Sequence, residues 1–173
     1  FSPKNVLEIG TYIGRSTLAI NFGGLCSIER FWTCDGTFDC MNFNDLKTTG
    51  FSEEKTESVG KIEYYGKTMS TELLKKSMDI NTKFDFIFVD GRLSGDDCSI
   101  LPKVMSDSCI ILLDDFEGVE KGVINVMMLR NVLKGFLLIE PPIEKDFKLG
   151  NLALLVPPNL ITLARQQSLP VNM

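Results

Sequence analysis

Short apolar runs alternate with segments of helical periodicity along most of the chain. The apolar and β-branched runs predict strands at 5–9, 31–34, 61–65, 84–89 and 108–113. Apolar positions at helical spacing follow the first, third and fifth runs, and a short helix is predicted between the fourth and the fifth. The polar stretch 37–49 is predicted to be helical in part.

Such alternation favours parallel strands that are buried on both faces and joined by right-handed crossovers. The end of the chain breaks the pattern, because the strands predicted at 135–140 and 151–156 have no helix between them and should pair antiparallel. The predicted fold class is therefore α/β, a doubly wound, mostly parallel seven-stranded sheet with a C-terminal antiparallel pair. We expect one domain over residues 1–157 and a C-terminal tail at 158–173, where a short helix is an open option.

Composition narrows the class of partner. The 173 residues suit one domain, and a net charge of −5 argues against nucleic acid or an anionic membrane as the main partner. The longest apolar runs, 109–113 and 135–139, are far shorter than the roughly 20 residues of a membrane helix. The five cysteines form no C-x-x-C pair and predict reduced thiols, as expected in the cytoplasm.

Acidic residues stand at or next to the ends of four of the first five predicted strands. They are Glu8, Asp35, Asp90 and the pair Asp114–Asp115. In an open parallel sheet, ligands bind outside the carboxyl ends of the strands, where the strand order reverses. Because a buried carboxylate needs partners, these residues indicate a cleft for a cationic or polyhydroxyl ligand.

The turn after the first strand indicates which ligand. A dinucleotide site needs G-x-G-x-x-G, and the segment from Gly10 to Gly14 lacks the middle glycine. Glu8, two residues before Gly10, suits a ligand with an ammonium group and no phosphate. Asp35 is placed to accept both hydroxyls of a ribose. Taken alone, however, the two glycines could form a simple strand-to-helix turn, and Asp35–Gly36 could be turn chemistry only.

The segment Val6-Leu-Glu-Ile-Gly-Thr-Tyr-Ile-Gly-Arg-Ser-Thr-Leu18 resembles the first motif of class I S-adenosylmethionine-dependent methyltransferases. The similarity is to the catechol and caffeoyl-coenzyme A O-methyltransferase branch and its bacterial relatives. Further pieces follow in family order at 33–35, 66–68, 84–91 and 109–115, and the closing antiparallel pair is also typical, so the resemblance covers roughly residues 4–157. It implies the Rossmann-like methyltransferase fold and methyl transfer to a hydroxyl of a small molecule.

The resemblance also implies a set of residues that bind S-adenosylmethionine. They are Glu8, Gly10, Tyr12, Gly14, Ser16, Asp35, Gly66, Lys67, Thr68 and Asp90. Within this set, Glu8 and the Gly10 backbone would hold the methionine end, with Ser16 on its carboxylate. Asp35 would take the ribose diol, and the 66–68 loop would border the adenine. Judged as aromatic residues alone, Tyr12 and Trp32 are expected to pack in the core.

In the metal-dependent branch, the residues that match Asp90, Asp114 and Asp115 bind a divalent cation. For this chain the resemblance therefore implies a site for Mg²⁺ or Ca²⁺ at these three residues. For Asp114–Asp115, a helix cap before residue 117 is the alternative. Asp90 and Asp114 are the candidate catalytic residues. The chain has no histidine, Arg92 stays protonated, and no lysine is a secure match to the family's base, so the base must be an aspartate or a metal-bound hydroxyl.

Two other functions stay open. The family's helices before the first strand, which commonly cover the substrate, have no counterpart among these residues, so we expect cofactor binding to exceed turnover. The chain could therefore be a catalytically weak, methyltransferase-like cofactor-binding module. A nucleotide-dependent oxidoreductase is less favoured, because of the missing glycine. The methyl acceptor is not specified by the sequence, and a homodimer is an open option.

Overall fold

The computed structural model describes residues 1–24, 27–37, 62–116, 119–140 and 152–161. Its strands are β1 (Asn5–Ile9), β2 (Arg30–Asp35), β3 (Ile62–Gly66), β4 (Phe84–Val89), β5 (Met105–Leu113), β6 (Leu137–Ile139) and β7 (Ala153–Val156). Its helices are α1 (Arg15–Gly23), α3 (Ser70–Asp79), α4 (Gly95–Val104) and α5 (Ile124–Val132), with a π-helical turn, η3 (Val119–Val123), and a 3-10 turn, η4 (Pro158–Leu160). The stretch 38–49, predicted to be partly helical, lies outside the described residues.

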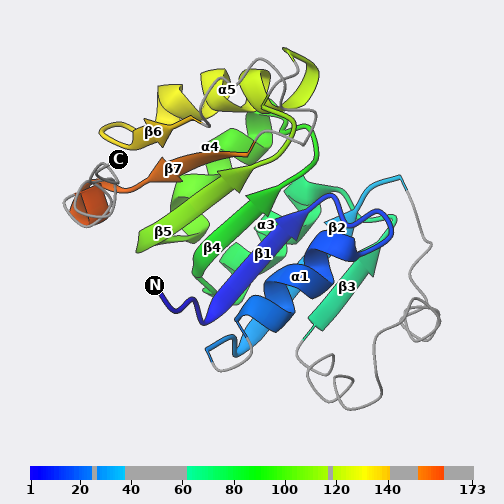
Figure 1. The fold of residues 1–173 in the computed structure, drawn as a ribbon. Coiled ribbons are helices and arrows are strands. Elements are labelled where there is room, and N and C mark those ends of the chain that lie inside the picture. Colours follow the sequence, from blue (N-terminus) through cyan, green and yellow to red (C-terminus); the bar gives the residue numbers. More distant parts are fainter. Residues whose placement is uncertain (25–26, 38–61, 117–118, 141–151, 162–173) are drawn as a thin grey trace, which may run out of the picture.

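The strands form one seven-stranded sheet in the order β3-β2-β1-β4-β5-β7-β6 (Figure 1). The first five strands pair parallel to their neighbours, whereas β7 runs antiparallel to both β5 and β6. The doubly wound sheet with its closing antiparallel pair is therefore confirmed. The strand order reverses between β1 and β4, because the chain winds outward from β1 to β3 and then returns to start again at β4.

The boundaries of β1 and β4 agree with the prediction, whereas β5 begins earlier than expected, at Met105. Helix α4 ends at Val104 and runs directly into this strand. The polar triplet 106–108 hides that start in the sequence, because it lacks the apolar pattern of a buried strand. The pairing with β4 is also irregular here, with a register shift between Phe84 and Phe86.

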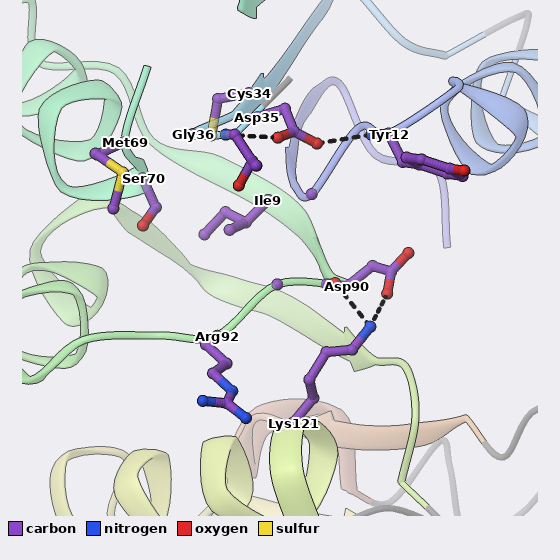
Figure 2. A pocket seen from close by; sticks show the side chains of 13 residues that line it. Ile9, Tyr12, Cys34, Asp35, Gly36, Met69, Ser70, Asp90, Arg92 and Lys121 are labelled. Atoms are coloured by element: carbon purple, nitrogen blue, oxygen red, sulfur yellow. Dashed lines mark hydrogen bonds and ion pairs between the residues drawn. The ribbon is translucent and has the colours of Figure 1, made fainter. Parts of the chain in front are cut away.

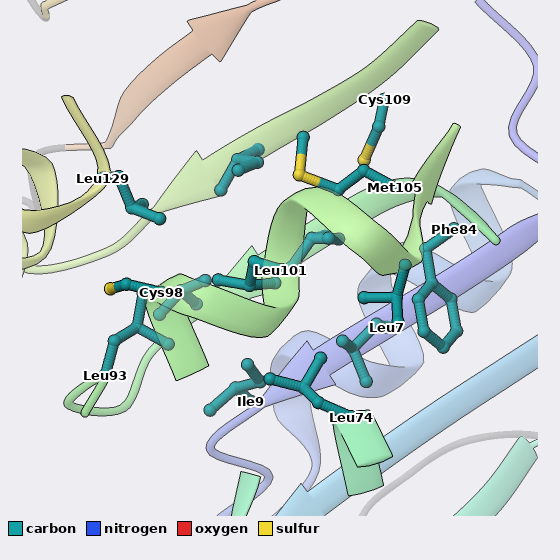
Figure 3. Packing of buried hydrophobic residues seen from close by; sticks show 14 of the residues in the cluster. Leu7, Ile9, Leu74, Phe84, Leu93, Cys98, Leu101, Met105, Cys109 and Leu129 are labelled. Atoms are coloured by element: carbon teal, nitrogen blue, oxygen red, sulfur yellow. The ribbon is translucent and has the colours of Figure 1, made fainter. Parts of the chain in front are cut away.

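The side chains of the strands point alternately to the two faces of the sheet and form two hydrophobic cores of unequal size. The larger core lies between the sheet and α3, α4 and α5, where Leu74 and Leu101 pack over Leu7 and Ile9 (Figure 3). The smaller core, under α1, contains Val6, Ile28 and Phe31. Because successive residues of a strand face opposite sides, neighbours such as Val6 and Leu7 belong to different cores.

Polar side chains join the starts of α3 and α4. The Ser94 hydroxyl accepts a hydrogen bond from the Asp97 N–H (3.1 Å), and the Asp97 carboxylate accepts one from the Ser94 N–H (2.8 Å), which is a capping box. The same carboxylate accepts bonds from the hydroxyls of Ser70 (2.9 Å) and Thr71 (2.5 Å) at the start of α3. This network fixes Ser70, which faces the cavity described below.

The described cysteines, Cys34, Cys98 and Cys109, are free and buried. Burial raises the pKa of the Cys34 thiol to about 12 and that of Cys109 still further, so both are inert core thiols, as predicted. Cys26 and Cys40 lie outside the described residues. Among the residues described here, no helix has the length and apolar character needed to cross a membrane.

Candidate functional site

A cavity of about 470 Å³ opens at the carboxyl ends of β1, β2 and β4, where the strand order reverses (Figure 2). Its lining residues come from five segments that are distant in the sequence. They are Ile9, Gly10, Tyr12, Cys34, Asp35, Gly36, Thr37, Met69, Ser70, Asp90, Gly91, Arg92 and Lys121. In Figure 2, Asp35 and Tyr12 lie on one side of the cavity, and Arg92 and Lys121 lie on the other.

Gly10 lets two turns approach each other at the base of this cavity. Its φ angle is +100°, and a Cβ atom at this position would lie 2.9 Å from the carbonyl carbon of Asp90. The Gly10 N–H donates to the Cys34 carbonyl (2.9 Å), and the Asp90 N–H donates to the Ile9 carbonyl (2.9 Å). The ends of β1, β2 and β4 are thereby held together.

Asp35 is the acid at the end of β2, and only 8% of its surface is exposed. One carboxylate oxygen accepts the Tyr12 N–H and the other accepts the Thr37 N–H, both at 2.9 Å. Tyr12 adopts a left-handed backbone conformation (φ 44°) in the turn after β1. The two bonds fix the orientation of the carboxylate at the cavity wall.

Tyr12 does not pack in the core. Its side chain is 56% exposed at the cavity, so the expectation of a buried packing residue was wrong for Tyr12, and the alternative, a cofactor-binding position, stays a prediction. The other aromatic residue of that expectation, Trp32, is buried as predicted. The difference arises because Tyr12 lies in the left-handed turn after β1, whereas Trp32 lies inside β2.

Glu8 is fully buried and outside the set of residues that line the cavity. Its carboxylate accepts hydrogen bonds from the hydroxyls of Ser16 (2.6 Å), Thr33 (2.6 Å) and Thr17. Burial raises its pKa to about 7, although the three hydroxyl bonds act in the opposite direction. Glu8 and Ser16 therefore contact each other, and together they tie β1 to α1 beside the cavity.

The remaining expected cofactor residues lie next to the cavity rather than in its wall. Gly14 precedes α1 with a φ of 75° and is buried. In the 66–68 loop, the Thr68 N–H donates to the Asp35 carbonyl (3.2 Å), and Lys67 has a φ of 52°. This loop leads into Met69 and Ser70, which do line the cavity.

Lys121 is a site residue that the sequence analysis missed. Its ammonium group donates to the Asp90 carboxylate (2.9 Å) and to the Asp90 carbonyl (3.3 Å), and it also forms an ion pair with Asp115. Burial lowers the pKa of Lys121, but the hydrogen bonds and charges of Asp115 and Asp90 outweigh this effect and raise the pKa above its ordinary value. Lys121 therefore stays protonated and is no base.

Asn125 is a second residue that was missed. Buried at the start of α5, it donates from its amide to the Gly91 carbonyl (2.8 Å) and accepts the Leu93 N–H (3.0 Å). These bonds fix the turn that carries Asp90 and Arg92. A buried polar residue on an otherwise apolar helical face was the signal available in the sequence.

The described residues Asp90, Asp114 and Asp115 are not arranged as a metal site in this structure. Within the described parts of the chain, no group of three or more His, Cys, Asp or Glu side chains is arranged to hold a metal ion. The ammonium of Lys121 lies between the carboxylates of Asp90 and Asp115 instead. Asp114 accepts the Asp115 N–H (2.9 Å), and its pKa is raised by burial and by the charges of Asp90 and Asp115. The alternative of a helix cap concerns residues 117–118, which the structure does not describe.

No protein-family model matches the sequence, and no curated relative is found. Solved structures do show the same fold. One is a spermidine synthase from Thermotoga maritima, with a TM-score of 0.56 and 13% sequence identity, and the match covers 89% of this chain and 52% of the synthase. Another is the O-methyltransferase TomG from Streptomyces achromogenes in complex with S-adenosylmethionine, with a TM-score of 0.57 and 17% identity, and the match covers 90% of this chain and 74% of TomG. A third is the methyltransferase domain of bacterial CtHen1, with a TM-score of 0.54 and 12% identity, and the match covers 89% of this chain and 90% of that domain.

The chain spans about half the length of the spermidine synthase. At these identities the similarity shows the fold, which is the Rossmann-like methyltransferase fold with its C-terminal antiparallel strands.

Proposed function

We propose that the chain binds S-adenosylmethionine in this cavity and transfers the methyl group to a hydroxyl oxygen of a small molecule. The observation that carries the proposal is Asp35, oriented by two main-chain N–H groups beside the point where the strand order reverses. A carboxylate in this position accepts hydrogen bonds from a ribose diol. The complex of TomG with S-adenosylmethionine, on the same fold, supports the same ligand.

The residues present fit this cofactor. The cavity volume of about 470 Å³ lies in the range of small-molecule sites. Ile9 and Met69 supply apolar wall, Asp35 supplies an acceptor for hydroxyls, and Asp90 supplies negative charge for an ammonium or sulfonium group. When bound, the cofactor supplies a methyl group activated by positively charged sulfur.

The acceptor is proposed to bind on the side of Asp90, Arg92 and Lys121. The carboxylate of Asp90 lies at the cavity, and the Lys121 ammonium nitrogen orients it from 2.9 Å away. The Asp90 carboxylate would accept the hydroxyl proton of the acceptor, whose oxygen would take the methyl group that the cofactor supplies. The walls must hold the reacting atoms about 3 to 3.5 Å apart and in line, which supplies much of the rate.

One observation favours the weaker alternative, a cofactor-binding module without turnover. The Lys121 ammonium already donates a hydrogen bond to one carboxylate oxygen of Asp90 at 2.9 Å, so that oxygen is less available to take a proton from the acceptor. Both functions predict cofactor binding at Asp35. They differ in whether labelled methyl from the cofactor appears in any member of a panel of phenols, catechols and sugars.

The proposal is tested by thermal unfolding and calorimetry with S-adenosylmethionine, S-adenosylhomocysteine and NAD. A ligand at 100 times its dissociation constant stabilises a protein by about 2.7 kcal/mol. We expect this from the first two ligands and not from NAD. Asp35→Ala should weaken binding by roughly 1.5–3 kcal/mol for each hydroxyl bond lost.

The matched control is Asp79→Ala, which removes an exposed aspartate at the end of α3 that is remote from Ser70 and the cavity. It should leave the cofactor affinity unchanged. The absence of any stabilisation at millimolar cofactor would refute the proposed function. An equal response of both variants would show that Asp35 does not hold the ligand.

A further inference from the structure

We infer that the Lys121 ammonium takes the place of a divalent cation at the carboxyl ends of β4 and β5, so that the site works without a bound metal ion. The carboxylates expected to be metal ligands are those of Asp90, Asp114 and Asp115, and a single nitrogen contacts two of them. This inference concerns the charge balance of the site, and it holds whether or not the chain transfers a methyl group.

The hydrogen bonds of Lys121 match the capacity of an ammonium group. Lysine has three N–H donors. The three oxygen atoms around it are the Asp90 carboxylate oxygen at 2.9 Å, the Asp90 carbonyl oxygen at 3.3 Å and a carboxylate oxygen of Asp115. One nitrogen therefore fastens the end of β4 to the end of β5, as a shared metal ion would.

The fold fixes Lys121 in this position through its neighbour Gly122. A Cβ atom at Gly122 would lie 2.6 Å from the Cα atom of Phe116 and 2.7 Å from the Asp115 carbonyl oxygen. The π-helical turn η3 therefore packs directly against residues 115–116, with no room for a side chain between them. Asp115, beside this contact, has a left-handed backbone conformation (φ 54°).

Charge supports the same interpretation. Asp114 is close enough to Asp90 and Asp115 for their charges to act on it, so three like charges share this region. Among the described cations, Arg92 is the other one that lines the cavity, and it lies 3.5 Å from Glu120, with both side chains largely exposed. Lys121 is thus the cation that contacts this carboxylate cluster directly, and a metal ion would have to displace it.

Lys121 is consequently a positioning residue, since it acts on the reaction through Asp90. Its role can be tested on the free protein by titrating Mg²⁺ and Mn²⁺ in a calorimeter. Wild type should bind both ions only weakly and without a stoichiometric end point. Lys121→Met keeps the length of the side chain and removes the charge, so it should bind Mn²⁺ at least about tenfold more tightly than wild type, a difference of about 1.4 kcal/mol.

Two variants complete the design. Lys121→Arg keeps the charge and should behave as wild type, whereas a purely steric role would predict wild-type behaviour for Lys121→Met as well. Lys134→Met is the matched control, because Lys134 is an exposed lysine beyond the end of α5 whose ammonium donates to the Arg130 carbonyl (3.4 Å). It should not acquire metal binding.

Two results would overturn the inference. One is stoichiometric binding of Mg²⁺ or Mn²⁺ by the wild-type protein. The other is a folded Lys121→Met variant that binds no more Mn²⁺ than wild type does, because its freed carboxylates would then not form a cation site. Should Lys121→Met fail to fold, the melting temperature of the wild type in chelator and in millimolar Mn²⁺ decides: equal values support the inference, and a rise with Mn²⁺ refutes it.

Discussion

Replacing Glu8 by glutamine should remove a pH dependence of stability that this one buried carboxyl group creates. Glu8 is fully buried among the hydroxyls of Ser16, Thr17 and Thr33, and burial raises its pKa from an ordinary 4.5 to about 7. The folded protein therefore holds the Glu8 proton more tightly than the unfolded chain does. Glutamine is neutral and of the same shape, and hydroxyl groups can accept as well as donate, so the packing should survive.

The difference between 4.5 and about 7 corresponds to about 3 kcal/mol. Because the pKa is higher in the folded state, this stabilisation is fully present below pH 4.5 and is lost as the pH rises to 7. Above pH 7 the ionised carboxylate has to stay buried without its proton. Between pH 4.5 and pH 8, wild type should therefore lose about 3 kcal/mol relative to Glu8→Gln.

The assay is urea unfolding of wild type and Glu8→Gln at several pH values in this window. The difference between the two free energies of unfolding is the quantity to follow, because other carboxyl groups titrate in both proteins. Glu29→Gln is the control: it removes an exposed carboxylate that pairs with Lys4 at 2.8 Å, and it should leave the pH profile of wild type intact. Parallel curves for wild type and Glu8→Gln would refute the reasoning.

Two further substitutions test the local structure. Gly10→Ala places a Cβ atom 2.9 Å from the Asp90 carbonyl carbon at a φ of +100°, so thermal unfolding should show a loss of stability of about 1–3 kcal/mol. Gly23→Ala is the control, because there is open space around Gly23, and it should be neutral or stabilising. Equal effects of the two substitutions would contradict the close approach of the two turns. Ser94→Ala removes the hydroxyl that accepts the Asp97 N–H and should cost about 1 kcal/mol in chemical unfolding; an unchanged midpoint would show that the capping box contributes nothing.

Most of the fold could be predicted from the sequence because its strands are local signals. Runs such as 5–9 and 84–89 are apolar and end in glycine or an acid, so their boundaries and parallel pairing were predicted correctly. The start of β5 was not, because a polar triplet continues the strand there.

The direction of Glu8 could not be taken from its place near a strand end. Val6 and Glu8 share the face of β1 that packs under α1, since side chains alternate along a strand. The carboxylate therefore meets the hydroxyls of α1 instead of the cavity. The position of an acid near a strand end does not tell which face of the sheet its side chain points to. Asp35 and Asp90 do line the cavity, as predicted.

Lys121 was missed for a different reason. The turn that carries it is π-helical, so the periodicity of 3.6 residues does not apply there. Its direction depends on how closely Gly122 approaches Phe116, which is a tertiary contact. A lysine six residues after two adjacent acids was the signal available, and it is a weak one, because exposed lysines are common on helices.

The central claim, that the cavity at the end of β2 binds S-adenosylmethionine, is tested most directly by a crystal structure of the chain grown with S-adenosylhomocysteine. We predict that the two ribose hydroxyls lie about 2.5–3.0 Å from the carboxylate oxygens of Asp35, with the amino acid end of the ligand toward Gly10 and Asp90. A ligand bound instead in a second hollow, of about 630 Å³ between the ends of α4 and α5 and residues 157–159, would contradict this claim. The absence of ligand from the cavity lined by Asp35 and Asp90, at a saturating ligand concentration, would also contradict it.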